Sequence, residues 1–439
     1  MNVHGAGLAA LAGWVGLTWV SRATAHSLVP FLLIQAWQWL IFLWILGRIE
    51  TSPGRGKIGS ILGWAVAFRL CGWAAWPLME DDYFRFLWDG FQLVATGNPY
   101  AAAPAAFFTD PSVPERFQDI LDQINYPHVP TIYGPVCQLL FGASYLIAPA
   151  ELWAWKLCVL IFDLGWLVLV VALSRSKEEA MPGASRPVAR AVLIVSWAPL
   201  MVFETSYNAH PDIIGVALLT LALLCQRRGR MAWAGWALGL AVGAKVFAVL
   251  LVPFVLGRSW RGWVAFVAVV PALYLPFWLQ GGTADVGGLI AYGRTWEFNS
   301  SLFAIAQWLS SPQLSRVLCG GLFVGLWVWL LLRQELGRTP ERPGTFMPPG
   351  LLILGAFFLL SPTVNPWYLL WLAPFLVGRA SPTALAAWAF VSLSYITGLN
   401  LGDPSLNHFQ HPVWVRPVEY GGMATVAFWE WSRTRSRTL

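Results

Sequence analysis

The chain has 439 residues, of which 57% are hydrophobic and only 11% are charged. Soluble globular proteins carry about 25% charged residues, so this composition excludes an ordinary soluble enzyme and favours a multi-pass helical membrane protein. The net charge of +6 is distributed over short loops, so it reports membrane topology and does not indicate nucleic-acid binding.

Apolar runs long enough to cross a bilayer recur from one end of the sequence to the other. They predict an all-α fold: a polytopic transmembrane bundle of about 11–13 membrane helices, forming a single domain over residues 1–439. The predicted membrane helices are 5–20, 28–47, 58–78, 153–173, 189–203, 213–226, 263–279, 316–332, 350–360, 367–377, 383–397 and 417–431.

Two apolar segments do not fit as simple spans. If residues 134–148 crossed the membrane fully, every later loop would change side, so a re-entrant or steeply tilted hairpin arm is preferred. Residues 231–256 have basic residues at both ends and are interpreted as two half-helices that turn back near Gly243-Ala244-Lys245. Broken helices at membrane depth are tolerated where they line a cavity or are buried in protein.

Basic residues are concentrated in alternate loops, which the positive-inside rule assigns to the cytoplasm. The remaining loops, 79 to about 132, 204–212, 281–300, 361–366 and 398–416, are therefore predicted to face outward. The basic residues that define the cytoplasmic side are Arg48, Arg55, Lys57, Arg175, Lys177, Arg186, Arg190, Arg227, Arg228, Arg230, Arg258, Arg261, Arg333, Arg338, Arg342, Arg379, Arg433, Arg435 and Arg437.

The first outward loop begins with three consecutive acids, Glu80, Asp81 and Asp82, at a predicted membrane surface. On a helix, Asp82, Arg85 and Asp89 share a face at spacings of three and four residues. A Gly97-Asn98-Pro99 sequence then stops this helix. The loop is thus predicted to present two carboxylates and a guanidinium at the boundary between water and lipid, although acids at a helix start can also simply stabilise the helix dipole.

The other outward loops and the break near Lys245 carry further polar groups, which either form a site or serve as helix caps and interfacial anchors. Lys245, inside an apolar segment, either binds an anion or extends to the membrane surface. Lys156 and Asp163 share a helix face and could bracket a polar seam. The histidines and cysteines lack metal-site spacing, and no phosphate-binding glycine loop is present, so neither a metal nor a nucleotide cofactor is expected.

These residues resemble a known family. Asp81-Asp82, Arg85, Trp88-Asp89-Gly90 and Gly97-Asn98-Pro99-Tyr100 are similar to the first outward loop of the GT-C superfamily of membrane glycosyltransferases, in particular its polyprenyl-phosphate-mannose-dependent, glycosyltransferase family 87-like branch. Three further stretches agree, and where this chain has Gly134, family members often carry a second proline. These stretches are Thr131-Ile132-Tyr133-Gly134-Pro135, Asn208-Ala209-His210-Pro211-Asp212 and Ser361-Pro362-Thr363-Val364-Asn365-Pro366-Trp367-Tyr368.

The resemblance implies an enzyme that takes a sugar, with mannose the first expectation, from a polyprenyl phosphate on the outer side of the membrane. The sugar passes with inversion to a hydroxyl of a lipid or glycan, and an acid of the first outward loop, Asp82 or Asp81, is the general base. Membrane lipids are the expected surroundings, a bacterial plasma membrane the expected location. The candidate substrate-binding residues are Arg85, Asp89, Tyr133, His210, Asp212, Lys245, Arg294, Asn365, Trp367, Tyr368, His408 and His411.

Two other classes of protein remain open at this point. Broken helices and a buried lysine also suit a transporter or a lipid-linked glycan flippase, although a transporter keeps its key charges near the middle of the membrane. A non-catalytic membrane assembly subunit would scatter the outward polar groups instead of bringing them together.

Overall fold

A computed structural model describes residues 2–23, 28–49, 55–180, 188–281, 283–336, 347–378 and 380–435. These residues form helices joined by loops, and among them the only β-pairing is an isolated bridge between Phe298 and Thr363. The predicted all-α class is therefore confirmed. Several basic residues assigned to the cytoplasmic side lie outside the described residues, namely Arg186, Arg338, Arg342, Arg379 and Arg437.

The chain forms two compact units, so the predicted single domain stays a prediction. The first unit comprises residues 1–68, 170–202 and 296–439, and the second comprises residues 69–169 and 203–295. Helices α3 (Arg55–Ala74) and α7 (Leu152–Ala180) contribute to both.

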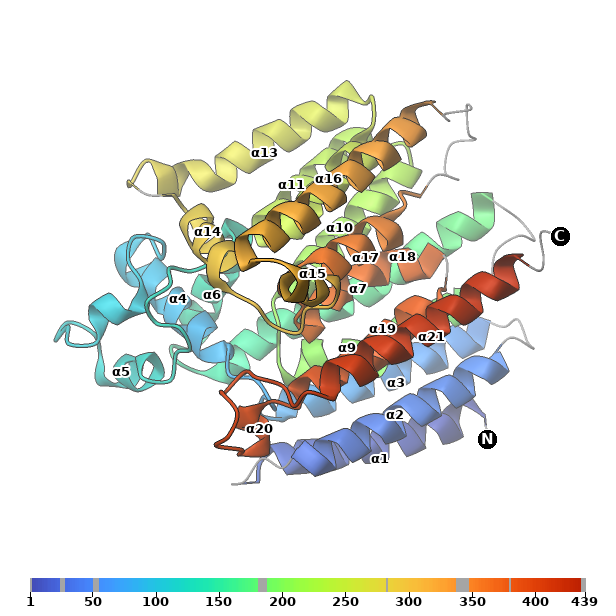
Figure 1. Cartoon of the computed structure of the whole chain (residues 1–439), viewed down its shortest axis with the longest axis horizontal. Helices are drawn as coiled ribbons and strands as arrows, with labels where there is room; N and C mark the ends of the chain where they lie inside the picture. The colour runs from blue at the N-terminus through green and yellow to red at the C-terminus, as the bar shows by residue number, and fades with distance from the viewer. Residues whose placement is uncertain are drawn as a thin grey trace. The chain divides into compact units, whose positions relative to one another are not determined.

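The first unit is built from antiparallel and crossing helices that pack in sequence-local pairs, such as α1 with α2 and α19 with α21 (Figure 1). Gln38 of α2 donates a hydrogen bond to the carbonyl of Ala10 in α1 at 2.8 Å, which joins two apolar helices by a buried polar contact. The elements of this unit besides α3 and α7 are α1 (Val3–Ser21), α2 (Leu28–Arg48), α8 (Val188–Trp197), α9 (Pro199–Val202), α15 (Leu302–Leu309), α16 (Pro312–Leu336), α17 (Gly350–Leu360), η5 (Pro366–Leu372), α18 (Ala373–Gly378), α19 (Pro382–Phe390), η6 (Val391–Tyr395), α20 (Gly398–Leu401) and α21 (Val415–Arg435).

The second unit holds the predicted first outward loop. Helices α10, α11 and α13 lie side by side, and α4 packs on α6 (Figure 1). Glycine makes both packings close, because a Cβ at Gly90 of α4 would lie 2.4 Å from the Phe141 carbonyl oxygen, and one at Gly235 of α11 would lie 2.0 Å from that of Gly262. The elements of this unit besides α3 and α7 are α4 (Tyr83–Thr96), η2 (Pro104–Phe107), α5 (Glu115–Leu121), α6 (Pro135–Ile147), η3 (Phe203–Tyr207), α10 (Asp212–Arg227), α11 (Met231–Ala244), η4 (Val246–Leu251), α12 (Val252–Leu256), α13 (Trp260–Trp278) and α14 (Asp285–Thr295).

Among the described residues, five helices are long and apolar enough to cross a membrane, or six if the bent pair formed by α8 with residues 199–207 is one span. This number is smaller than the twelve spans predicted, because several apolar runs fold as short or broken helices. Examples are α17 and the η5–α18 segment. An apolar run in the sequence does not show where its backbone bends, which the packing of neighbouring helices decides.

The two irregular segments behave as predicted in their local geometry. Helix α6 has 13 residues, which corresponds to a length of about 20 Å and is less than the roughly 30 Å of a hydrocarbon core. Helix α11 ends at Ala244, and Lys245 has extended backbone angles before η4 begins. The side chain of Gln226, just before α11, donates to the carbonyl of Val255 in α12 at 2.8 Å. The end of this segment therefore lies close to its beginning.

Candidate active site

Asp82 lies at the N-terminus of helix α4, and its carboxylate does not cap the helix. Asp82 occupies the N-cap position with αR angles, and its side chain makes no capping hydrogen bond within this described helix. Instead, the Tyr133 hydroxyl donates to Asp82 Oδ2 at 3.2 Å. The helix ends at Gly97, whose φ of 77° gives the left-handed C-terminal cap that the sequence predicted. The half-buried Asp82 carboxylate therefore remains available for chemistry.

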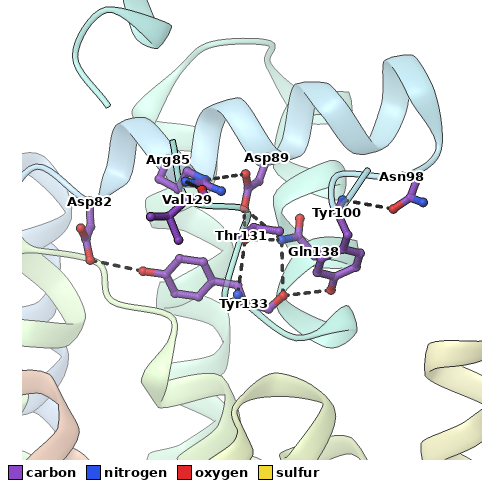
Figure 2. Close-up of polar contacts among 9 residues, drawn as sticks. All are labelled: Asp82, Arg85, Asp89, Asn98, Tyr100, Val129, Thr131, Tyr133 and Gln138. Atoms are coloured by element: carbon purple, nitrogen blue, oxygen red, sulfur yellow. Dashed lines mark hydrogen bonds and ion pairs between the residues drawn. The ribbon is translucent and has the colours of Figure 1, made fainter. Parts of the chain in front are cut away.

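Asp89 is the hub of a buried polar network, shown in Figure 2. Its Oδ1 accepts from Arg85 Nε at 2.9 Å, and its Oδ2 accepts from Thr131 Oγ1 at 2.5 Å and from Gln138 Nε2 at 2.9 Å. Arg85 also donates to the carbonyl of Val129 at 3.1 Å. Because both carboxylate oxygens are occupied, Asp89 is suited to holding residues 129–138 against α4 rather than to contacting a substrate.

The residues of the predicted face, Asp82, Arg85 and Asp89, lie on or at the start of α4, but they have different partners. Arg85 is bound to Asp89 and to the strip of residues 129–138, whereas Asp82 is held by Tyr133 from that strip. Tyr133 is fixed in turn, because its backbone oxygen accepts from the Tyr100 hydroxyl at 2.9 Å (Figure 2). A spacing of three residues brings Asp82 and Arg85 to one face, but tertiary contacts decide their partners.

The acid triplet is crowded with like charges. Burial, and then the neighbouring Asp82, raise the pKa of Asp81 to about 7, and its Oδ1 accepts a hydrogen bond from Asn125. Burial also raises the pKa of Glu80 well above its usual value, with further contributions from the charges of Asp82, Asp81 and Glu204. Burial and like-charge repulsion therefore favour protonation of Glu80 and Asp81 near neutral pH.

His210 joins this acidic site from a distant part of the chain. Its imidazole is buried, and one ligating atom each of Glu80, Asp82 and His210 lie within 4.8 Å of one another. The loop reaches this position through the π-helical turn η3 and through Ala209, whose φ of 56° is unusual for a residue with a side chain. The predicted convergence of His210 with the first outward loop is thus found in the structure.

Lys156 of α7 joins the backbones on which the acids and His210 lie. Its buried ammonium group donates to the carbonyls of Gly72 and Ala75 at 2.7 Å each, and to that of Tyr207 at 3.1 Å. Gly72 and Ala75 lie at the end of α3, a few residues before Glu80, and Tyr207 precedes His210. A cation that satisfies three C-terminal carbonyls is favoured by the helix dipole and holds both segments in register.

The predicted polar seam on α7 is present. Asp163 lies two helical turns after Lys156. It forms a buried ion pair with Arg69 at 2.9 Å and accepts a hydrogen bond from Thr205 at 2.5 Å. Charges inside an apolar bundle are costly unless they are paired in this way. The seam connects α3, α7 and η3, so it supports the same loops from within the unit.

The remaining predicted residues of the second unit take different positions. Lys245 binds both carboxylate oxygens of the buried Asp212 at 2.8 Å, so it neither extends to the surface nor stands as an isolated anion site. Arg294 lies in the last turn of α14 with an exposed side chain. No contact among those of the described residues joins Arg294 to the acids.

Five predicted residues belong to the first unit and are described separately. Trp367 and Tyr368 are buried in η5, and Asn365 is the residue that precedes it. His411 is buried with Nε2 3.0 Å from the Ser394 carbonyl oxygen, whereas His408 is exposed, so they do not act as a pair. Burial lowers the pKa of His411 to about 4, which leaves it uncharged at neutral pH.

Sequence reasoning missed three polar residues that shape the site. Glu204 lies 2.9 Å from His210 Nδ1, Asn208 accepts from the Leu78 amide at 3.1 Å, and Asn125 binds Asp81. Glu204 and Asn208 lie in the same polar segment, 204–212, as His210. The polar composition of this segment could have indicated them as site residues. Asn208 and its partner Leu78 are 130 residues apart, and Asn125 and Asp81 are 44 residues apart, so these contacts were not visible in the sequence.

The chain was compared with family models, solved structures and curated proteins. A family model described as "Alpha-(1->6)-mannopyranosyltransferase, N-terminal domain" matches residues 3–261, which is more than half of the chain. Among solved structures, the crystal structure of ArnT from Cupriavidus metallidurans bound to undecaprenyl phosphate has 16% sequence identity and a TM-score of 0.44, covering 83% of this chain and 71% of that one. No curated protein matches the chain by sequence.

Proposed function

The chain belongs to the alpha-(1->6)-mannopyranosyltransferase family and is a membrane glycosyltransferase, and we propose that it transfers mannose from a polyprenyl phosphate to a hydroxyl of a lipid or glycan. The family supports mannose as the sugar. The lipid-borne donor is supported by the motifs of the first outward loop and by the absence of a nucleotide-binding glycine pattern from the sequence. We place the reaction on the outer side of the plasma membrane, where loop 79–132 is predicted to lie.

In the proposed reaction, the acceptor oxygen attacks the anomeric carbon of the mannosyl group from the face opposite the phosphate, so the configuration inverts. The new carbon–oxygen bond forms as the bond between the anomeric carbon and the phosphate oxygen breaks. The polyprenyl phosphate leaves with that electron pair, and the acceptor proton passes to the Asp82 carboxylate. A positioned base of this kind contributes about 10²–10⁴-fold to a rate.

The assignment of Asp82 as the base is based on its carboxylate, which accepts a single hydrogen bond among the described residues, from Tyr133. Asp89 uses both oxygens on three donors, and Asp81 is bound by Asn125. Asp82 instead receives one long hydrogen bond from a tyrosine and stands beside His210. Asp82 is therefore the first choice for the base and Asp81 the second.

The test compares purified Asp82→Asn and Asp81→Asn proteins in a transfer assay with radiolabelled polyprenyl-phosphate mannose. Asp82→Asn keeps the size of the side chain and removes its basicity, so we expect turnover to fall by about 10²–10⁴-fold, with a much smaller loss for Asp81→Asn. An inactive Asp81→Asn protein beside an active Asp82→Asn protein would exchange the two roles. Full activity in both variants would refute a carboxylate base at this site.

A matched control separates chemistry from folding. Asp119 lies exposed on α5 in the same loop, and Asp119→Asn removes the same charge without touching the site. We expect it to retain wild-type turnover. The sugar is tested in the same assay by replacing the mannose donor with a glucose donor on the same lipid, which the wild-type protein should use poorly.

A further inference from the structure

Helix α14 lies against the strip of residues 129–138, which carries Tyr133. A Cβ at the buried Gly288 of α14 would lie 2.6 Å from the Thr131 carbonyl oxygen and 2.7 Å from that of Pro130. Both distances are shorter than the 3.0 Å that Cβ atoms keep from other heavy atoms, so glycine allows the helix to touch the backbone of the strip. The strip is therefore packed against α14 as well as hydrogen-bonded to α4.

The first residue of α14 is fixed to the preceding helix. Asp285 is buried, and its Oδ2 accepts a hydrogen bond from the hydroxyl of Tyr274 in α13 at 3.2 Å. Burial raises the pKa of Asp285 to about 6, so the group accepts this bond as a carboxylate above about pH 7. We call Tyr274 and Asp285 the clasp, because together they tie the N-terminus of α14 to α13.

The turn between α13 and α14 is held by tertiary contacts. Ala284, directly before Asp285, has a φ of 49°, a left-handed conformation that residues with a Cβ rarely adopt. Such a conformation persists where the surrounding structure enforces it. Ala284 is buried and packs in one cluster with Tyr274, Phe277 and Tyr100. The clasp and this cluster therefore fix the direction in which α14 leaves α13.

The same cluster reaches Tyr133 by a second route. The Tyr100 ring packs edge-on against Phe277, with 5.0 Å between ring centroids, and the Tyr100 hydroxyl donates to the Tyr133 carbonyl at 2.9 Å (Figure 2). Tyr133 in turn donates its own hydroxyl to Asp82 Oδ2 at 3.2 Å. A shift of the turn between α13 and α14 would therefore reach the Asp82 carboxylate through Gly288 and through Tyr100.

We propose that Tyr274 and Asp285 are positioning residues of the transfer reaction, which fix α14 against the strip of residues 129–138 and thereby hold the Tyr133 hydroxyl on the carboxylate of Asp82. The inference rests on the proposed function, because it takes Asp82 as the base. A base must be held within about 0.5 Å of its productive position by partners that are themselves fixed. A misplacement of about 1 Å can lower a rate roughly 10²-fold, so a clasp outside the acid triplet can control the chemistry inside it.

The packing effect of the clasp is tested without any substrate, by amide hydrogen exchange of the purified full chain in detergent micelles. We expect peptides from residues 129–138 to exchange at least about fivefold faster in Tyr274→Phe and in Asp285→Asn than in the wild-type protein, because the strip opens locally more often. Tyr145→Phe on α6 and Asp119→Asn on α5 remove the same groups away from the clasp, and they should leave this exchange unchanged. Wild-type exchange rates in both clasp variants would overturn the proposal.

The effect on the reaction is measured as turnover with the radiolabelled mannose donor. Tyr274→Phe should lower kcat by about tenfold and change KM for the donor by less than about twofold, because the clasp acts on the base and not on donor binding. A smaller folded fraction would also lower kcat, so a double-mutant cycle with Tyr133→Phe separates the two causes. Without the Tyr133 hydroxyl the clasp has nothing to hold on Asp82, so adding Tyr274→Phe to Tyr133→Phe should change kcat by less than about twofold. A further loss of about tenfold in the double variant would contradict the proposal.

Gly288→Ala tests the contact between α14 and the strip directly. The new Cβ would push on the Thr131 carbonyl, so kcat should fall by at least about tenfold, whereas Gly165→Ala on α7 meets no atom within 4 Å and should retain wild-type turnover. Equal turnover of Gly288→Ala and the wild-type protein would refute the role of α14. A wild-type protein that transfers no mannose would instead refute the proposed function, and the exchange measurement would still decide whether the clasp holds the strip.

Discussion

Replacement of Asp89 by asparagine tests whether this buried residue of α4 holds residues 129–138 in place. The carboxylate accepts hydrogen bonds from Arg85, Thr131 and Gln138, and it is 1% exposed. Asparagine keeps the shape, but it removes the charge opposite Arg85 and presents an NH₂ group to at least one of the other donors. Asp89→Asn is therefore expected to lower stability and to loosen residues 129–138.

The expected magnitude follows from the burial of the two partners. Removing one member of a buried ion pair costs about 3–5 kcal/mol. The Arg85 side chain is 13% exposed and keeps its bond to the Val129 carbonyl, so part of its charge remains solvated. We therefore expect Asp89→Asn to lower the free energy of unfolding by about 2–4 kcal/mol, after the discount for this exposure.

The measurement is unfolding by sodium dodecyl sulfate titration in mixed micelles. Asp119→Asn is the control, because it removes the same charge at an exposed position. A double-mutant cycle with Arg85→Gln isolates the pair, and we expect a coupling energy above about 1 kcal/mol. Because Tyr133 belongs to the strip that Asp89 holds, turnover should fall together with stability. An Asp89→Asn protein as stable as Asp119→Asn, or a coupling energy near zero, would refute the structural role of the hub.

Three further predictions concern other positions. Gly134→Ala should destabilise the protein by about 1–3 kcal/mol, because the new Cβ would lie 2.3 Å from the Gly243 carbonyl oxygen, whereas Gly165→Ala meets no atom within 4 Å and should be tolerated in the same denaturation assay. His411 has a folded-state pKa lowered to about 4 from 6.5, so the unfolded state binds more protons between these values. Stability should therefore fall by about 3 kcal/mol as the pH drops from 6.5 to 4, and a pH titration of the unfolding free energy that is identical in His411→Gln would contradict this. A cysteine at the exposed Ala101 should react with an impermeant maleimide on intact cells beyond the background of the wild-type protein, and reaction only after permeabilisation would reverse the predicted topology.

The sequence was sufficient for the class of protein and for much of its segmentation. Low charge and long apolar runs favour membrane helices, because a helix pairs the backbone groups of such a run within the run itself. The stop at Gly97, the break at Lys245 and the short helix at 135–147 were also predictable, since glycine, a charge in an apolar run and proline act locally on the backbone. The acids of the first outward loop stood out because they follow an apolar run directly.

Only the tertiary structure decided how the polar side chains pair. Asp82, Arg85 and Asp89 share one helix face, yet Arg85 pairs with Asp89 and Asp82 with Tyr133, because the strip of residues 129–138 lies against that face. The meeting of Glu80 with His210 depends on Lys156 and on a π-helical turn, which join segments more than a hundred residues apart. Hydrophobic patterning depends on near neighbours in the sequence and can be read from it, whereas a hydrogen bond or an ion pair depends on distances of a few ångströms that only the packed chain sets.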